Sequence, residues 1–91
     1  MNTEPKFRLG QTVITPGALQ KLDPLDVHAA MSRHVTGDWG DVDEHDRNEN
    51  EFALGKHLRL FSVYHDQNGT KFWIITEADR SVTTILLPDE Y

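Results

Sequence analysis

The C-terminal third of the chain carries the pattern that most restricts the fold. Two segments rich in β-branched and aromatic residues, 58–65 (LRLFSVYH) and 71–77 (KFWIITE), flank Asn68-Gly69, the strongest short-range signal for a β-hairpin. A third segment of the same kind, 81–87 (SVTTILL), follows a turn at Asp79-Arg80 and ends at Pro88. Three consecutive strands joined by short turns predict an antiparallel meander.

The expected register of this meander assigns side chains to two faces. A two-residue turn at Asn68-Gly69 places Val63 opposite Ile74, and the second turn places Ile74 opposite Ile85. We then expect one face, toward the helices, to carry Phe61, Val63, Phe72, Ile74, Ile85 and Leu87. The other face carries Leu60, Tyr64, Trp73, Ile75 and Leu86, and it is unusually apolar for a solvent face. Either the N-terminal segment covers it, or Tyr64, Trp73, Ile75 and Leu86 form an interface, for example in a homodimer.

The N-terminal half contains paired signals for helix starts and stops. Residues 11–15 favour a short edge strand. Thr15-Pro16 and Asp23-Pro24 each place a capping side chain before a proline, and Gly37 is a plausible end for the second helix. Asp43 should cap a further helix over 44–54, ended by Gly55. We predict a single α+β domain over residues 1–91. In it, an antiparallel sheet of three to four strands packs against two or three short N-terminal helices, and residues 1–6 form a flexible arm.

Negative charge is concentrated in one segment. Residues 38–51 contain seven acids (Asp38, Asp41, Asp43, Glu44, Asp46, Glu49 and Glu51) and a single base, Arg47. This segment therefore holds the whole formal net charge of −6, because the remaining residues contain eight acids and eight bases. Such a cluster is either a solvated helix start or a surface for a cation or a basic partner.

Composition excludes several classes of protein. The chain of 91 residues has no cysteine, which rules out disulfides, thiolate catalysis and cysteine-based zinc sites. An acidic chain without clustered bases is not expected to bind nucleic acid directly. No apolar run approaches the length of a membrane span, and the first residues lack an apolar stretch behind a basic start, so we expect a cytoplasmic location without membrane contact.

Known catalytic and metal motifs are missing from the sequence. No phosphate-binding loop, no Gly-x-Ser-x-Gly elbow and no HExxH motif occurs. Asp41-x-Asp43-x-His45 has the spacing of the first calcium ligands, but Asp46 and Phe52 stand where an EF-hand needs glycine and glutamate. A loose site for magnesium or manganese from Asp38, Asp41 and Asp43 remains as an alternative. We therefore assign no catalytic residue, no metal and no cofactor.

One further cluster lies at the second turn of the meander. Glu77, Asp79 and Arg80 are close in sequence and are flanked by hydroxyl residues. They are interpreted either as a charged hairpin tip or as a small polar site in which Arg80 binds an anion.

The phrases GDWGD (37–41) and WIITEADRS–TT–LLP–EY (73–91) carry a resemblance. Over residues 7–91 the chain resembles a family of bacterial proteins of about this length that are carried on plasmids, integrative elements and other mobile DNA. Members are sometimes labelled as related to type I restriction-modification systems, but the motifs of a DNA methyltransferase are missing from this sequence. The resemblance implies a mobile-DNA context and no catalytic residues.

These observations predict a small acidic binding or accessory protein without catalytic activity. Its partner would be a protein, plausibly basic, that contacts Asp38, Trp39, Asp41, Asp43, Glu44, Asp46 and Glu49. In a more specific form, the acidic segment acts as a decoy that competes with nucleic acid for a host defence enzyme. The alternative is a small metal-dependent hydrolase or nuclease that uses the carboxylates of residues 38–46 together with His45.

Overall fold

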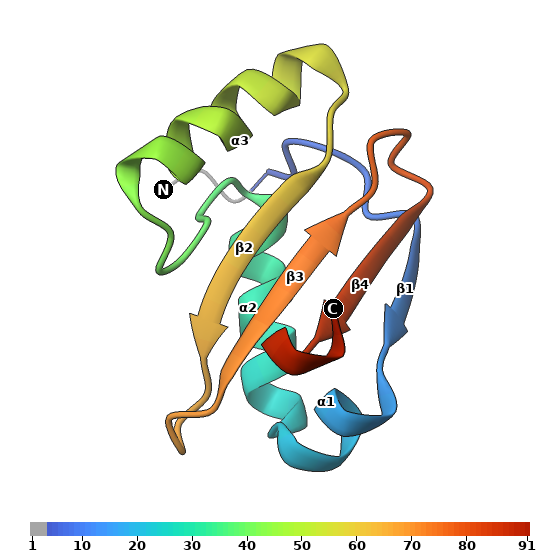
Figure 1. Ribbon diagram of the computed structural model, residues 1–91. Coiled ribbons are helices and arrows are strands. Elements are labelled where there is room, and N and C mark those ends of the chain that lie inside the picture. Colours follow the sequence, from blue (N-terminus) through green and yellow to red (C-terminus); the bar gives the residue numbers. More distant parts are fainter. Residues whose placement is uncertain (1–3) are drawn as a thin grey trace.

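The computed structural model describes residues 4–91, which form one sheet with helices packed mainly on one of its faces (Figure 1). Its elements are β1 (Gln11–Ile14), α1 (Pro16–Lys21), α2 (Pro24–Val35), α3 (Glu44–Lys56), β2 (Leu60–His65), β3 (Lys71–Thr76), β4 (Val82–Leu86) and the 3-10 turn η1 (Pro88–Glu90). The strand order is β1-β4-β3-β2. The α+β class and the meander are confirmed.

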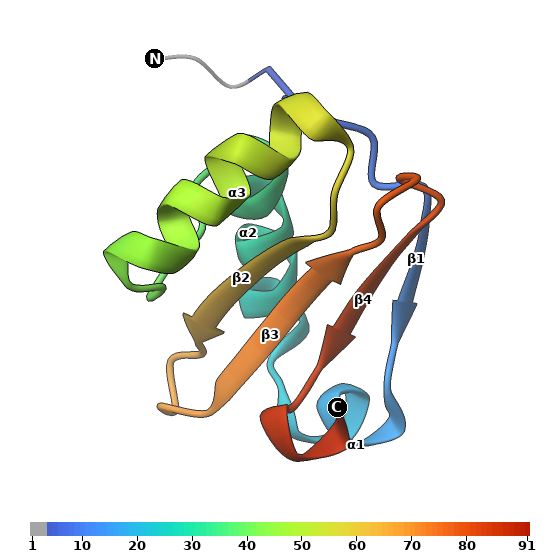
Figure 2. The same ribbon diagram turned by 45° about the horizontal axis from the view of Figure 1, so that its top comes forward.

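The sheet is mixed, because β1 runs parallel to β4 while the other two pairings are antiparallel. The sheet is thus mostly antiparallel, and the parallel β1–β4 pair is its one departure from the predicted antiparallel sheet. The chain leaves β1, passes through all three helices and both strands of the hairpin, and returns to β1's side only with β4 (Figures 1 and 2). A long connection of this kind permits parallel pairing, which a tight turn does not.

The helix starts follow the local sequence signals. The side chains of Thr15, Asp23 and Asp43 accept hydrogen bonds from backbone N–H groups in the first turns of α1, α2 and α3. The predicted end of α3 at Gly55 is wrong, since the helix continues to Lys56 and ends where His57 adopts a left-handed conformation with φ of 54°. Gly55 is tolerated because it lies on the exposed side of the helix.

The first hairpin differs from its predicted register by one residue. Tyr64 pairs with Phe72, and Val63 pairs with Trp73 rather than with Ile74. The loop holds three residues, because Asp66 and Thr70 close it by a hydrogen bond from the Asp66 N–H to the Thr70 carbonyl. Asp66 Oδ1 also accepts from the N–H groups of Asn68 and Thr70, which favours this longer loop. A slip of one residue moves every side chain of β2 to the other face.

The helix-covered face therefore carries a different set of β2 residues. Tyr64 is buried there with Phe72 and Ile74, so its assignment to the opposite face is wrong. The main core cluster combines residues of both layers: Ala18, Leu22, Ala30, Tyr64, Phe72, Ile74, Ile85 and Leu87. A second cluster of Trp39, Ala53 and Leu60 joins α3 to the sheet.

The opposite face carries Trp73, Ile75 and Leu86, as predicted, but the C-terminus covers part of it. The ring of Trp73 packs against Phe61 and Tyr91, with ring centroids 5.0 and 5.8 Å away. Ile75 and Leu86 are each only 5% exposed. The end of η1 is held in place by Glu90, whose carboxylate accepts hydrogen bonds from the Thr15 hydroxyl and the Gly17 N–H. The face thus offers less apolar surface to a partner than the sequence suggests.

The predicted flexible arm of residues 1–6 does not include residue 6. The N–H of Lys6 donates to the Val35 carbonyl, and Phe7 packs against the rings of His34 and Trp39. Residue 6 is therefore attached to the body of the protein, while residues 1–3 lie outside the described part of the chain.

Candidate functional site

The acidic segment runs along the β2 edge of the sheet, first as a loop and then as α3 (Figure 2). Trp39 lies in its loop but is only 3% exposed, and its indole N–H donates to the Glu51 carboxylate at 2.8 Å. Of the two positions open to it from the sequence, in the core or facing a ligand, Trp39 therefore occupies the core. Trp39 anchors the loop because the indole fills the space between α3, Phe7 and β2.

Two of the acids have cationic or imidazole partners outside the segment. Asp38 forms a two-point contact with the Arg33 guanidinium, at 2.8 and 3.2 Å, and this contact lowers the pKa of the Asp38 carboxyl. Asp41 Oδ2 lies 2.7 Å from Nδ1 of His65. These two carboxylates fasten the loop to α2 and β2, and they contribute less free negative charge than the sequence suggests.

Three further acids of the segment lie on α3. Glu44 and Glu49 are exposed and Asp46 is half-buried, and among residues 4–91 the ion pairs of Asp46 and Glu49 are formed with His45 of the same helix. Phe52 lies in the same helix with 56% of its surface exposed. His45, Asn48, Glu49 and Phe52 line a shallow pocket on this helix. We call Glu44, Asp46, Glu49 and Phe52 the acidic face of α3.

A candidate metal cluster lies at the start of the same helix. One ligand atom each from Asp43, His45 and Asp46 lies within 4.8 Å of the others. Asp43 Oδ1 is already engaged as the helix cap, 2.8 Å from the Asp46 N–H. Asp38 and Asp41, which the sequence places in the cation site, instead bind Arg33 and His65.

The polar residues of the second turn do not converge on a common site. Asp79 accepts hydrogen bonds from Ser81, and Glu77 accepts from Arg59. Arg80 adopts φ of 62°, and its guanidinium donates to four backbone carbonyls, those of Ala53, Leu58, Glu77 and Ala78. Arg80 thus joins the end of α3 to the β3–β4 turn, and its donors are used within the protein.

A buried histidine joins α2 to the sheet. His34 is fully buried, with Nδ1 2.5 Å from the Ser62 hydroxyl and Nε2 2.9 Å from the Thr76 hydroxyl. Thr76 bonds Thr83, whose hydroxyl donates to the Leu9 carbonyl. Because the Thr83 hydroxyl donates to Leu9, it accepts from Thr76, and Thr76 in turn accepts from His34. His34 Nε2–H is therefore a donor, and Nδ1 accepts from Ser62. Burial lowers the pKa of His34 to about 3, so the imidazole is neutral.

This serine–histidine pair is a polar part of the core. Ser62 has no exposed surface, so its hydroxyl cannot meet a substrate. The sequence analysis did not identify this pair. The available signal was the row of hydroxyl residues at Ser62, Thr76 and Thr83, which are small and polar where a core strand is otherwise apolar.

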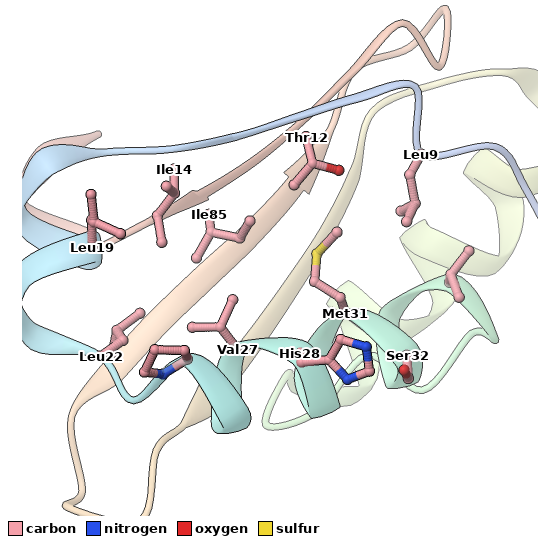
Figure 3. A pocket seen from close by; sticks show the side chains of 12 residues that line it. Leu9, Thr12, Ile14, Leu19, Leu22, Val27, His28, Met31, Ser32 and Ile85 are labelled. Atoms are coloured by element: carbon pink, nitrogen blue, oxygen red, sulfur yellow. The ribbon is translucent and has the colours of Figure 1, made fainter.

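An apolar groove lies between β1 and α2 (Figure 3). It has a volume of about 500 Å³, and the labelled side chains of β1 and α2 point toward one another across it. It is lined by Leu9, Thr12, Ile14, Leu19, Leu22, Pro24, Val27, His28, Met31, Ser32, Val35 and Ile85, with no carboxylate among them. Sequence reasoning missed the groove, because the short helices gave no indication that α2 would leave the β1 side of the sheet uncovered.

Comparisons with known proteins add no assignment to these surfaces: no family model matches the chain, and no curated protein or solved structure matches it either. Among residues 4–91, no helix is both long and apolar enough to cross a bilayer.

Proposed function

We propose that this protein is a non-catalytic binding protein that recognises a basic protein surface through the acidic face of α3. The observation that carries the proposal is the exposed aromatic ring of Phe52 on a helix that also presents Glu44, Asp46 and Glu49 to solvent. A protein contact gains from burying an exposed phenylalanine, and the carboxylates of the same helix favour a basic partner. The charged group that lies over the ring itself is the ammonium of Lys56, 6.0 Å from the ring centroid.

The packing of α3 supports this role. Asn50 and Ala53 are buried against the sheet, and the capping bond of Asp43 fixes the start of the helix. The acidic face is therefore held on a rigid element rather than on a loop. A preorganised surface loses less conformational entropy on binding.

A more specific form of the proposal is that the partner is an enzyme that binds nucleic acid. The row of carboxylates would occupy its basic groove and exclude the phosphate backbone, as an acidic decoy does. The resemblance to proteins carried on mobile DNA supports this form, because such DNA encounters host defence enzymes. A cytoplasmic location is part of this proposal.

Charge-matched variants test the proposal. Affinity capture at low salt would identify the partner, whose dissociation constant is then measured. Neutralising the acidic face with E44Q, D46N and E49Q should weaken binding at least about tenfold, and Phe52→Ala should weaken it by a similar factor. The control carries E4Q, E77Q and D89N, which remove the same charge from other elements. Equal affinity of the acidic-face variant and the control would overturn the proposal.

The alternative is a metal-dependent hydrolase, and the specific observation in its favour is the cluster of Asp43, His45 and Asp46. Two-metal hydrolysis needs clustered carboxylates, but it also needs groups that orient the substrate. Calorimetry with magnesium, manganese and zinc separates the two functions. Heat of binding that His45→Ala removes would favour the alternative, and no heat at millimolar metal would end it.

A further inference from the structure

The two edges of the sheet differ in whether their outward backbone groups have hydrogen-bond partners. At the β2 edge, the Asn50 side chain donates to the Phe61 carbonyl at 2.7 Å and accepts from the Phe61 N–H at 3.0 Å. The Val63 N–H donates to the Trp39 carbonyl, and the Val63 carbonyl accepts from the Asp41 N–H. The outward backbone groups of both strand residues are thus satisfied, and this edge is closed to another strand.

The β1 edge is open. The N–H groups of Gln11 and Thr15 donate toward β4, to the carbonyls of Ser81 and Ile85. Because backbone groups alternate along a strand, those of Thr12 and Ile14 point away from β4. Within residues 4–91, no element lies beyond β1 in either view of the molecule (Figures 1 and 2).

Apart from its short length of four residues, β1 lacks the sequence features that keep an exposed edge from pairing. Natural edge strands commonly carry lysine, proline or a bulge. Gln11–Ile14 contains no charged residue and no proline, and its register with β4 is regular over all four residues. The same Thr12 and Ile14 whose backbone groups are open also contribute side chains to the apolar groove.

We propose that the β1 edge binds the β1 edge of a second copy of this chain, in antiparallel orientation. Around a two-fold axis at Val13, Thr12 of each copy lies opposite Ile14 of the other. Each of these two pairs can exchange both of its N–H···O bonds, which is the hydrogen-bonded arrangement of an antiparallel ladder. The open edge is therefore complementary to itself, as a symmetric dimer requires.

The apolar surface around β1 fits the same occupant. Val13 is 36% exposed and Leu19 is 65% exposed, and Leu19 lies at the groove. In the paired arrangement, Ile14 of one copy lies beside Thr12 of the other on the groove side, and the two Val13 side chains meet on the opposite face. Pairing thus extends the apolar wall of each groove and covers side chains that are exposed in one copy.

Charge opposes a second copy at this edge only weakly. The segment that holds the net charge of −6 lies at the far edge, along β2. In a continuous sheet of two copies, seven strand spacings of about 4.8 Å separate the two β2 edges by about 34 Å. This distance exceeds the Debye length of about 8 Å at physiological salt, so the acidic segments repel each other weakly. The dimer presents one acidic face at each end.

Light scattering on the purified chain tests this inference, which does not depend on the proposed function. Wild type should have twice the mass of 10.4 kDa, and Val13→Lys should be monomeric because it places two like charges at the axis. Thr12→Pro removes an outward donor and should also be monomeric. Leu58→Lys, at an exposed apolar residue outside the groove, is the control and should remain dimeric.

Amide hydrogen exchange provides the direct readout. The amides of Thr12 and Ile14 should be protected in wild type and exchange rapidly in Val13→Lys, because only a second copy supplies their acceptors. A wild-type chain that is monomeric at every concentration overturns the inference, as does a Val13→Lys chain that remains dimeric. Protection of these amides only after a foreign extended peptide is added would also overturn it, in favour of a different occupant.

Discussion

At the scale of single residues, His34 makes the stability of the fold depend on pH. Its folded pKa of about 3 lies below the value of about 6.5 expected in the unfolded chain. As the pH falls below about 6.5, His34 binds a proton in the unfolded state but not in the folded state. The free energy of unfolding therefore decreases. From pH 7 to pH 5 this effect amounts to about 2 kcal/mol.

Replacement of His34 by glutamine isolates this effect. The glutamine amide does not bind a proton in this pH range. Between pH 7 and pH 5 we therefore expect the free energy of unfolding to decrease by about 2 kcal/mol less in the variant than in wild type, whatever its value at pH 7. Urea denaturation at both pH values measures the difference. Every other residue is the same in both proteins, so the difference between them isolates position 34. Equal pH dependence of the two proteins would show that His34 can be protonated in the fold.

Local signals predicted single residues well wherever a residue acts on its own neighbours. Thr15, Asp23 and Asp43 cap their helices as expected, because a capping side chain bonds a backbone N–H two or three residues away. The roles of Trp39 and Arg80 could not be decided from the sequence for the opposite reason. Their partners, Glu51 and the carbonyl of Ala53, are distant in sequence, and only the folded chain brings them together.

At the scale of elements, a buried polar side chain helps to dock α3 on the sheet. Asn50 is 3% exposed and supplies both a donor and an acceptor to Phe61 of β2, in place of a neighbouring strand. The helix has few apolar residues with which to pack, since Ala53 is its only fully buried one. These two hydrogen bonds therefore fix α3 on the edge of β2, together with the bonds from the Trp39 indole to Glu51 and from Arg80 to the Ala53 carbonyl.

A matched pair of substitutions tests this interpretation. Asn50→Asp keeps the acceptor but removes the donor, and it places a carboxylate beside the Phe61 carbonyl. We expect it to lower the free energy of unfolding by about 3 kcal/mol, because a buried carbonyl loses its partner and a charge is buried. Asn48→Asp makes the same change on the exposed side and should alter stability by less than about 0.5 kcal/mol. Urea denaturation measures both, and equal effects would contradict the role assigned to Asn50.

The hairpin shows where element prediction reached its limit. The three strands and their order were correct because each is a continuous β-rich segment between turn residues. The predicted register was off by one residue because Asn68-Gly69 fits a two-residue turn. In the structure the Asp66 carboxylate accepts from the N–H groups of Asn68 and Thr70, which favours a three-residue loop. That single difference placed Tyr64 in the core and Val63 on the other face.

At the scale of the whole molecule, the two edges of the sheet have different properties. The β2 edge is closed by Asn50 and the loop around Trp39, and it carries the acidic face of α3. The β1 edge is uncharged and adjoins the apolar groove. The sequence revealed the concentration of charge, but it could not reveal this separation, because the position of β1 beside β4 depends on how the helices cross the sheet.

The central claim is that carboxylates of the acidic face, rather than the protein's overall charge, bind a basic partner. The most direct measurement is the affinity for the captured partner between about 0.05 and 0.5 M salt, for wild type, the E44Q/D46N/E49Q variant and the E4Q/E77Q/D89N control. We predict that wild-type and control affinities fall with the same steep dependence on salt, while the acidic-face variant binds weakly and depends little on salt. Identical salt dependence in all three proteins would contradict the account.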